Sequence, residues 1–232
     1  MNLYVGTSGY SYKEWKGIFY PEKLPAKEML SYYASRLPAV EINNTFYRLP
    51  QQSMLEGWKE QVPEAFRFSI KASQRITHFK RLNNVAEETK YLLDTVSCLG
   101  ERLGVVLFQL PPNMKKDLPR LEAFLASLPA GTRAAFEFRH PTWLEDDVLE
   151  VLRQAGQALC ISDTDDMPVT HIDRTAGWGY LRLRRILYDE VALREWLQRV
   201  RDQGWSEAFV FFKHEDEGTG PRLAAEFLEL AK

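Results

Sequence analysis

Residues 134–143 read AAFEFRHPTW, and this stretch decides the fold because apolar and charged side chains alternate within it. Successive side chains of a β-strand point to opposite faces, so the two phenylalanines share one face while Glu137 and Arg139 share the other. A charge is costly to bury unless it is paired. The stretch therefore predicts a strand with one face packed on apolar elements and one face directed at a polar site.

Apolar runs of this kind alternate with amphipathic helical patterns along the whole 232-residue chain. The sequence predicts eight strands, at residues 3–8, 39–43, 66–71, 104–110, 134–139, 158–162, 179–184 and 208–213. It predicts helices at residues 26–36, 53–61, 84–99, 118–127, 146–155, 190–203 and 220–231. Strand–helix alternation favours parallel pairing through right-handed crossovers. We therefore predict an α/β fold, a TIM-type (β/α)8 barrel forming a single domain over residues 1–232, without a helix after the sixth strand.

An open doubly wound sheet is the alternative fold for the same alternation. Such a sheet usually carries a glycine-rich phosphate turn, G-x-G-x-x-G, after its first strand. Here the corresponding segment is Gly6-Thr7-Ser8-Gly9, which lacks that spacing. The barrel is therefore favoured.

Polar residues fall on the inner face, near the carboxyl end, of most predicted strands. They are Glu41, Asn43, Lys71, Gln109, Glu137, Arg139, Arg182, Arg184 and Lys213. His140, Asp163 and His214 begin the loops just beyond. Barrels of this type place their ligand sites at this end, with catalytic groups drawn from several strands. We expect one pocket, although any single residue, such as Glu137 paired with Arg182 or Lys71, can instead form a structural ion pair.

Two loops add candidates for ligand binding. The first, residues 9–25, is long and aromatic, so Tyr10 and Trp15 can line a pocket or stack on a planar ligand. The alternative is an aromatic cluster that covers the barrel end. The second, residues 73–84, carries His78 and Arg81 and is suited to a phosphate or carboxylate, unless it is simply a solvated loop.

Composition excludes several classes of protein. The net charge of −2 provides no global field for nucleic acid or an anionic membrane. No apolar run reaches the roughly 18 residues of a membrane span, and residues 1–10 show no signal-peptide pattern. Cys98 and Cys160 fall within a helical pattern and an apolar run, so we expect two free thiols and a cytoplasmic location.

Five motifs together resemble the DUF72 family, the YecE-like group, nearly from end to end. They are GTSGYSYKEWKGIFYP (6–21), VEINNTFYRLP (40–50), FSIKASQRITHFKRL (68–82), LFQLPPNM (107–114) and FEFRHPTW (136–143). The resemblance implies a TIM-type barrel but brings no established reaction. It places Gly9, Tyr10, Trp15, Glu41, Asn43, Thr45, Tyr47, Lys71, His78, Arg81, Gln109, Glu137, Arg139, His140 and Trp143 within family motifs.

Two strand ends depart from the pattern of that family. The seventh strand of the family usually ends in an Arg-Leu-His-Gly-like stretch, and Arg184 stands here in place of the histidine. The eighth usually ends in Tyr-Phe-Asn-Asn, and Lys213-His214 stand here in place of the two asparagines. Both changes add positive charge, so the ligand of this chain is expected to differ from that of typical members.

Three functions compete. The first is an enzyme that acts on a small, polar, anionic substrate carrying phosphate or carboxylate, without a metal or cofactor. Glu137, Lys71 and His140 are its candidate catalytic residues. The candidate ligand-binding residues are Tyr10, Trp15, Glu41, Asn43, His78, Arg81, Gln109, Arg139, Asp163, Arg182, Arg184 and Lys213.

The second function is a metal-assisted hydrolase or isomerase of the sugar-isomerase-like type. Its ligands would be Glu41, Glu137, Asp163 and either His140 or His214, but no H-x-H or H-E-x-x-H spacing occurs. The third is a non-catalytic module that binds a ligand or nucleic acid through basic and aromatic loops, which the balanced charge disfavours. The sequence does not indicate an oligomeric state.

The opening stretch also makes a mutational prediction. We expect Glu137→Gln to keep the fold but to abolish the binding or turnover that the pocket supports. In a solvated anion pocket the loss of stability should be about 1–2 kcal/mol. In a purely structural buried ion pair it should be about 3–5 kcal/mol.

Overall fold

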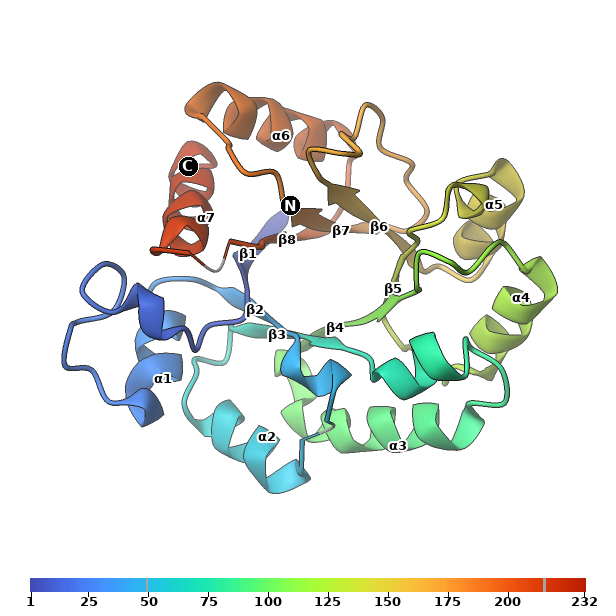
Figure 1. The fold of residues 1–232 in the computed structure, drawn as a ribbon, viewed down its shortest axis with the longest axis horizontal. Coiled ribbons are helices and arrows are strands. Elements are labelled where there is room, and N and C mark those ends of the chain that lie inside the picture. The colour runs from blue at the N-terminus through green and yellow to red at the C-terminus, as the bar shows by residue number, and fades with distance from the viewer. Residues whose placement is uncertain (49, 215) are drawn as a thin grey trace.

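The computed structural model describes residues 1–48, 50–214 and 216–232. Eight strands pair in parallel and in chain order, and β1 pairs with β8 to close the barrel (Figure 1). The strands are β1 (Asn2–Ser8), β2 (Ala39–Ile42), β3 (Arg67–Lys71), β4 (Leu103–Gln109), β5 (Ala134–Glu137), β6 (Ala158–Asp163), β7 (Trp178–Leu183) and β8 (Glu207–Phe212). The predicted TIM-type barrel is confirmed, and the open doubly wound alternative is wrong.

Seven α-helices of the described residues surround the strands in Figure 1. They are α1 (Met29–Ala34), α2 (Gln52–Glu60), α3 (Ala86–Val96), α4 (Leu118–Ser127), α5 (Asp146–Gln154), α6 (Glu190–Asp202) and α7 (Thr219–Leu230). As predicted, residues 164–177, which join β6 to β7, contain no helix. Within the described parts of the chain, no helix combines the length and the apolar character that crossing a bilayer requires.

Short helical turns complete the connections. They are η1 (Lys13–Trp15), η2 (Ala26–Glu28), η3 (Asn44–Phe46), the π-helical η4 (Arg75–Phe79), η5 (Ser97–Arg102) and η6 (Pro141–Trp143). Two predicted helices are consequently shorter than their sequence patterns. The pattern over residues 26–36 divides into η2 and α1, and the pattern over residues 84–99 leaves the α-helical geometry after Val96.

Helix α6 illustrates why these segments are helical. The Asp189 side chain caps its first turn by accepting a hydrogen bond from the backbone N–H of Ala192 at 2.8 Å. Leu193, Trp196 and Val200 are buried and recur at helical spacing, so one face of α6 packs on the barrel while the other meets water.

The barrel interior is divided along its axis. Its lower part is apolar, because the buried rings of Tyr180, Phe209 and Phe211 fill it. Tyr4 stacks on Phe209 with ring centroids 4.9 Å apart. The charged inner-face residues therefore lie above an apolar floor, at the carboxyl ends of the strands.

Five strands end one or two residues earlier than predicted. β2 ends at Ile42, β4 at Gln109, β5 at Glu137, β7 at Leu183 and β8 at Phe212. Arg139, Arg184 and Lys213 therefore lie just beyond the strands, at the rim of the barrel.

Candidate functional site at the barrel mouth

Glu41, Glu137 and Arg182 come from three strands and meet at the centre of the barrel. Arg182 donates from Nη2 to Glu41 Oε1 at 2.8 Å and from Nη1 to Glu137 Oε2 at 2.6 Å. The side chains of all three are at most 2 % exposed. We call these three residues the inner ion cluster. A single guanidinium bridges two buried carboxylates, which is the geometry in which a buried charge is best compensated.

The remaining lone pairs of Glu41 are occupied by neutral donors. Ser8 Oγ donates at 2.7 Å, Asn43 Nδ2 at 3.1 Å and the Tyr180 hydroxyl at 2.7 Å. Burial would raise the pKa of Glu41, but Arg182 and these hydrogen bonds outweigh it and lower the pKa of this carboxyl. Glu41 is therefore a fixed anion of the site.

Sequence reasoning missed Ser8 and Tyr180 as partners of Glu41. A signal was present, because Tyr180 shares the face of Arg182 two residues along the same strand. Tyrosine, however, fits an apolar interior as well as a polar site. The hydroxyl of Tyr180 also lies 2.6 Å from Ser69 Oγ, so its ring belongs to the apolar floor while its oxygen joins the polar network.

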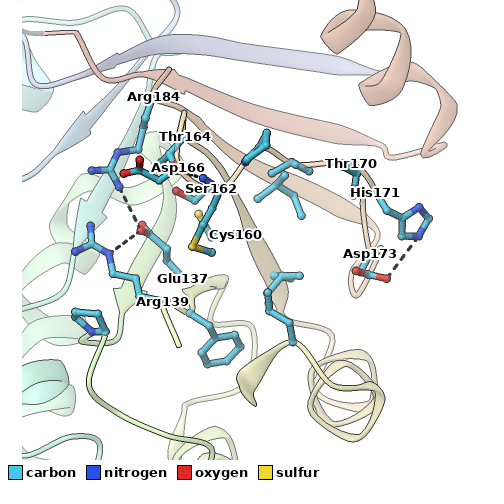
Figure 2. Close-up of a pocket in the computed structure, with 18 residues that line it drawn as sticks. Glu137, Arg139, Cys160, Ser162, Thr164, Asp166, Thr170, His171, Asp173 and Arg184 are labelled. Atoms are coloured by element: carbon cyan, nitrogen blue, oxygen red, sulfur yellow. Dashed lines mark hydrogen bonds and ion pairs between the residues drawn. The ribbon is translucent and has the colours of Figure 1, made fainter. Parts of the chain in front are cut away.

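Glu137 is surrounded by three guanidinium groups, and Figure 2 shows those of Arg139 and Arg184. Besides Arg182, Arg139 donates from Nε to Oε1 at 3.2 Å, and Arg184 Nη1 lies 3.6 Å from the same oxygen. Burial would raise the pKa of Glu137, but Arg182 and then Arg139 lower it to about 2. Glu137 is thus ionised at neutral pH and is a weak base, which favours a role as counter-charge over a role in proton transfer.

A cavity of about 170 Å³ opens above the inner ion cluster, and we call it the mouth cavity. It is lined by Asn43, Tyr47, Lys71, Gln109, Arg139, Arg182, Arg184 and Lys213. The side chains of Arg139 and Arg184 remain 33 % and 20 % exposed, so they can reach a ligand. Gln109 is 3 % exposed, and its amide lies beside Glu137, whose pKa it helps to lower. A ligand in the mouth cavity would meet an excess of cations.

Lys71 is a candidate proton carrier in this cavity. Its Nζ lies 4.2 Å from the centroid of the Phe46 ring, a cation–π geometry. Burial and then the positive charge of Arg182 lower the pKa of Lys71 to about 8. This value is close to neutral pH, where a general acid or base is most effective.

His78 packs against the same aromatic ring. Its imidazole meets the Phe46 ring edge-on at 4.8 Å between centroids, and its Nδ1 lies 2.9 Å from Thr77 Oγ1. Burial and then the charge of Lys71 lower the pKa of His78 below its usual value. The imidazole is therefore neutral at physiological pH.

Three predicted residues take structural contacts away from the mouth cavity. Asp163 accepts hydrogen bonds from Arg185 and from the Tyr188 hydroxyl, each at 2.8 Å, and so anchors the ends of β6 and β7. His140 accepts from the backbone N–H of Thr142 and begins the η6 turn. His214 Nε2 lies 2.5 Å from the carbonyl oxygen of Arg185. None of the three lines the mouth cavity.

The first loop forms the aromatic cluster that was the alternative interpretation of its sequence. Trp15 is fully buried against Tyr12, Phe19 and Tyr20, with centroids 4.7–6.1 Å apart. The hydroxyl of Tyr20 donates to the carbonyl of Tyr10 at 2.5 Å. Neither Tyr10 nor Trp15 lines the mouth cavity.

Gly9 makes the turn into that loop. Its φ of +91° lies in the region that favours glycine, and a Cβ there would approach the Tyr12 hydroxyl to 2.5 Å. Arg81, in the loop after β3, donates to Asn113 Oδ1 at 3.3 Å and does not line the mouth cavity.

The described residues offer little to a metal ion. In residues 1–48, 50–214 and 216–232, no three His, Cys, Asp or Glu side chains come together as a metal site would require. Arg182 occupies the space between Glu41 and Glu137, the two carboxylates that such a site would use. Cys98 and Cys160 are free thiols, as predicted.

A family model described as "Protein of unknown function DUF72" matches residues 4–232. The chain belongs to the DUF72 family. The UPF0759 protein YecE of Escherichia coli (strain K12) is 31 % identical over 140 residues, which is 60 % of this chain and 49 % of YecE. The matched stretch thus spans about half the length of that relative. The UPF0759 protein YunF of Bacillus subtilis (strain 168) is 23 % identical over 98 % of this chain and 94 % of its own.

Solved structures agree with the family assignment. A DUF72 family protein from Thermotoga maritima superimposes with a TM-score of 0.87 at 28 % identity and covers 100 % of this chain and 99 % of its own. A DUF72 family protein from Enterococcus faecalis has a TM-score of 0.80 at 19 % identity, over 98 % of this chain and 94 % of its own, and supports the fold alone.

Proposed function

We propose that the DUF72 barrel described above binds a small anionic molecule at its mouth and acts on it by acid–base catalysis. The observation that carries the proposal is the mouth cavity itself. Lys71, Arg139, Arg182 and Arg184 line it, whereas the inner ion cluster contributes only two carboxylates, both already engaged by Arg182. A phosphate or carboxylate group would supply the missing negative charge and accept charge-assisted hydrogen bonds.

Each lining residue has a role in this proposal. Arg139 and Arg184 are held from one side by Glu137 and keep the rest of their donors for the anion. Gln109, which lines the cavity, contacts the polar part of the substrate. Lys71, with its pKa of about 8, transfers the proton, and Glu137 positions the arginines. No metal or cofactor takes part in this scheme.

Neither alternative function finds comparable support. A metal-assisted reaction needs a group of ligands that the described residues do not bring together. A nucleic-acid site needs a basic surface that follows the phosphate backbone, whereas the cations here converge inside a cavity of about 170 Å³.

The proposal includes a cytoplasmic location, with which the two free thiols agree.

Anion binding can be tested by isothermal titration calorimetry with inorganic phosphate and with acetate. Arg184→His restores the family pattern and removes one permanent charge, so we expect about tenfold weaker binding with little change in stability. Arg185→His is the matched control, because Arg185 contacts Asp163 and does not line the mouth cavity. It should lower stability and leave anion affinity unchanged. No heat with either anion, or equal weakening by both variants, would disprove an anion site at the mouth.

Catalysis needs a separate experiment. A metabolite extract incubated with the wild type and with Lys71→Met can be followed by mass spectrometry. We expect at least one anionic compound to be consumed by the wild type, and to be bound but not consumed by Lys71→Met. Binding without consumption by the wild type would indicate a non-catalytic binding protein.

A further inference from the structure

The seam between β5 and β6 is short. The two strands pair only at Ala135↔Ala158 and Phe136↔Leu159, whereas β6 and β7 pair at four positions and β7 and β8 at six. β5 ends at Glu137, while β6 continues to Asp163. The last part of β6 therefore has no paired strand on its β5 side, and the barrel wall is open there.

A cleft of about 540 Å³ occupies this opening, and we call it the side cleft. No helix follows β6, so the coil of residues 164–177 borders the cleft where a barrel helix would otherwise pack. The wall of the cleft includes the apolar side chains of Phe138, Leu144, Leu159, Ile161, Met167 and Val169. Its size lies within the range of small-molecule sites in proteins, roughly 300–1,000 Å³.

The two ends of the side cleft differ in charge. Figure 2 shows Glu137, Arg139 and Arg184 together at one end, while His171 and Asp173 lie at the other. Arg139 and Arg184 line the mouth cavity as well. The side cleft is thus an apolar extension of the mouth cavity, joined to it through the two arginines.

Cys160 and Ser162 form the inner wall beside these arginines. Burial raises the pKa of the Cys160 thiol well above its usual value, so the thiol is neutral and packs as a small apolar group. Ser162 is half-buried and lines the cleft from β6. This wall therefore presents small side chains to any ligand, which leaves the volume of the cleft free.

We infer that the substrate of this site is an amphipathic anion, with its phosphate or carboxylate head in the mouth cavity and an apolar body in the side cleft. The inference rests on the proposed function, because it uses the same arginines for the head group. Contact with the apolar wall of the cleft removes the apolar body of the substrate from water, which favours binding. The arginines determine which end of the molecule enters the mouth cavity. A small inorganic anion would fill the mouth cavity and leave the apolar wall of the side cleft exposed to water.

The test is a titration of two homologous series, n-alkyl phosphates and n-alkyl carboxylates, from about two to eight carbons, beside inorganic phosphate. In the wild type we expect affinity to rise about fourfold for each added methylene, the transfer free energy of one buried CH₂. Ser162→Leu fills the cleft from its inner wall, so the affinity of this variant should hardly change with chain length. Ser53→Leu, the same substitution on the exposed surface of α2, is the matched control and should keep the wild-type dependence.

The outcomes separate this inference from the proposed function. If inorganic phosphate binds but affinity does not depend on chain length, the amphipathic substrate is disproved and the anion site stands. If chain length matters equally in the wild type and in Ser162→Leu, the apolar body lies elsewhere and the inference is wrong. If neither inorganic phosphate nor any member of either series binds, the proposed function fails first. A stronger response in one series identifies the head group.

Discussion

The inner ion cluster and the mouth cavity above it use the same residue types in opposite ways. In the cluster, Arg182 serves Glu41 and Glu137, and the charges are buried and matched. In the mouth cavity, Arg139 and Arg184 share a carboxylate that Arg182 already holds, and both remain partly exposed. A buried charge that is fully matched supports structure, whereas a partly matched one near solvent is available to a ligand.

The largest expected effect is a loss of stability when the inner ion cluster is broken. Arg182→Met leaves Glu41 and Glu137 buried without their shared cation, so we expect a loss of about 3–5 kcal/mol in urea unfolding at pH 7. Arg194→Met, which breaks an exposed pair on α6, should cost less than about 1 kcal/mol.

If Arg182→Met does not fold, the double variant Glu41→Gln/Arg182→Met should recover part of the stability, because one of the two unmatched charges is gone. The destabilisation by Arg182→Met should also shrink at acidic pH, where the freed carboxylates take up protons. A loss below about 1 kcal/mol would contradict a structural role for the cluster.

An intermediate effect is expected at Glu137, which belongs to both regions. The sequence alone predicted a loss of about 1–2 kcal/mol for Glu137→Gln in a solvated anion pocket. Its burial against Arg182 raises that expectation to about 3 kcal/mol. The sequence led us to expect that this variant loses ligand binding, but Glu137 is a counter-charge to three arginines, so anion binding should survive. Phosphate at about 10 mM should stabilise the variant more than the wild type, because the anion replaces the lost negative charge. Equal stabilisation of both proteins would contradict an anion site beside Glu137.

The pH dependence of the wild type follows from the sign of the Glu137 shift. Its pKa in the folded protein is about 2, below the ordinary value of 4.5, so the unfolded chain binds the proton more readily. The contribution of Glu137 to stability is therefore complete above pH 4.5 and is lost between pH 4.5 and about 2. In Glu137→Gln this part of the acid transition should be absent from urea unfolding curves.

The smallest expected effect is a change of anion affinity with pH, and it concerns the mouth cavity alone. Lys71 carries a pKa of about 8, so its positive charge disappears as the pH rises through that value. We expect phosphate affinity to fall severalfold between about pH 7 and 9, and Lys71→Met to remove this step. An identical step in the variant would assign the titration to another group.

Stability should change in the opposite direction over the same pH range. The pKa of Lys71 is lowered on folding, so its charged form is less stable in the folded protein than in the unfolded chain. The cost is complete below about pH 8 and is lost as the pH rises toward the ordinary value of 10.5.

The fold was predictable because strand parity and strand–helix alternation report directly on burial. Phe136 and Glu137 must face opposite sides of a strand, and the same rule held for Leu181 and Arg182. The predicted ends of the strands were less accurate, because a strand ends where its pairing with a neighbour ends, and the alternation of side chains does not report on pairing. Arg184 continues the alternation of β7 in the sequence but lies beyond its last paired residue.

The site was predictable to the extent that it depends on the same parity. Lys71, Glu137 and Arg182 meet as the alternation implies, whereas Asp163 points to the opposite face and binds Arg185. The sequence of the first loop allowed both a pocket wall and a buried aromatic cluster around Trp15, and it could not decide between them, because an aromatic ring packs equally well on a ligand or on its neighbours. The side cleft exists because β5 and β6 pair at only two positions, and no single residue in the sequence indicates this short pairing.

The short β5–β6 seam also has a consequence for native-state hydrogen exchange. A closed barrel protects its amides only as well as each pair of neighbouring strands holds together, and this pair is joined at two positions. Opening this seam exposes the carboxyl half of β6 without unpairing β1 from β8, where six positions pair. Amides near Ile161 and Ser162 should therefore exchange through a local opening, while those near Val5 wait for global unfolding. The region of the molecule that accepts the ligand is thus also the region whose protection a bound ligand would raise most.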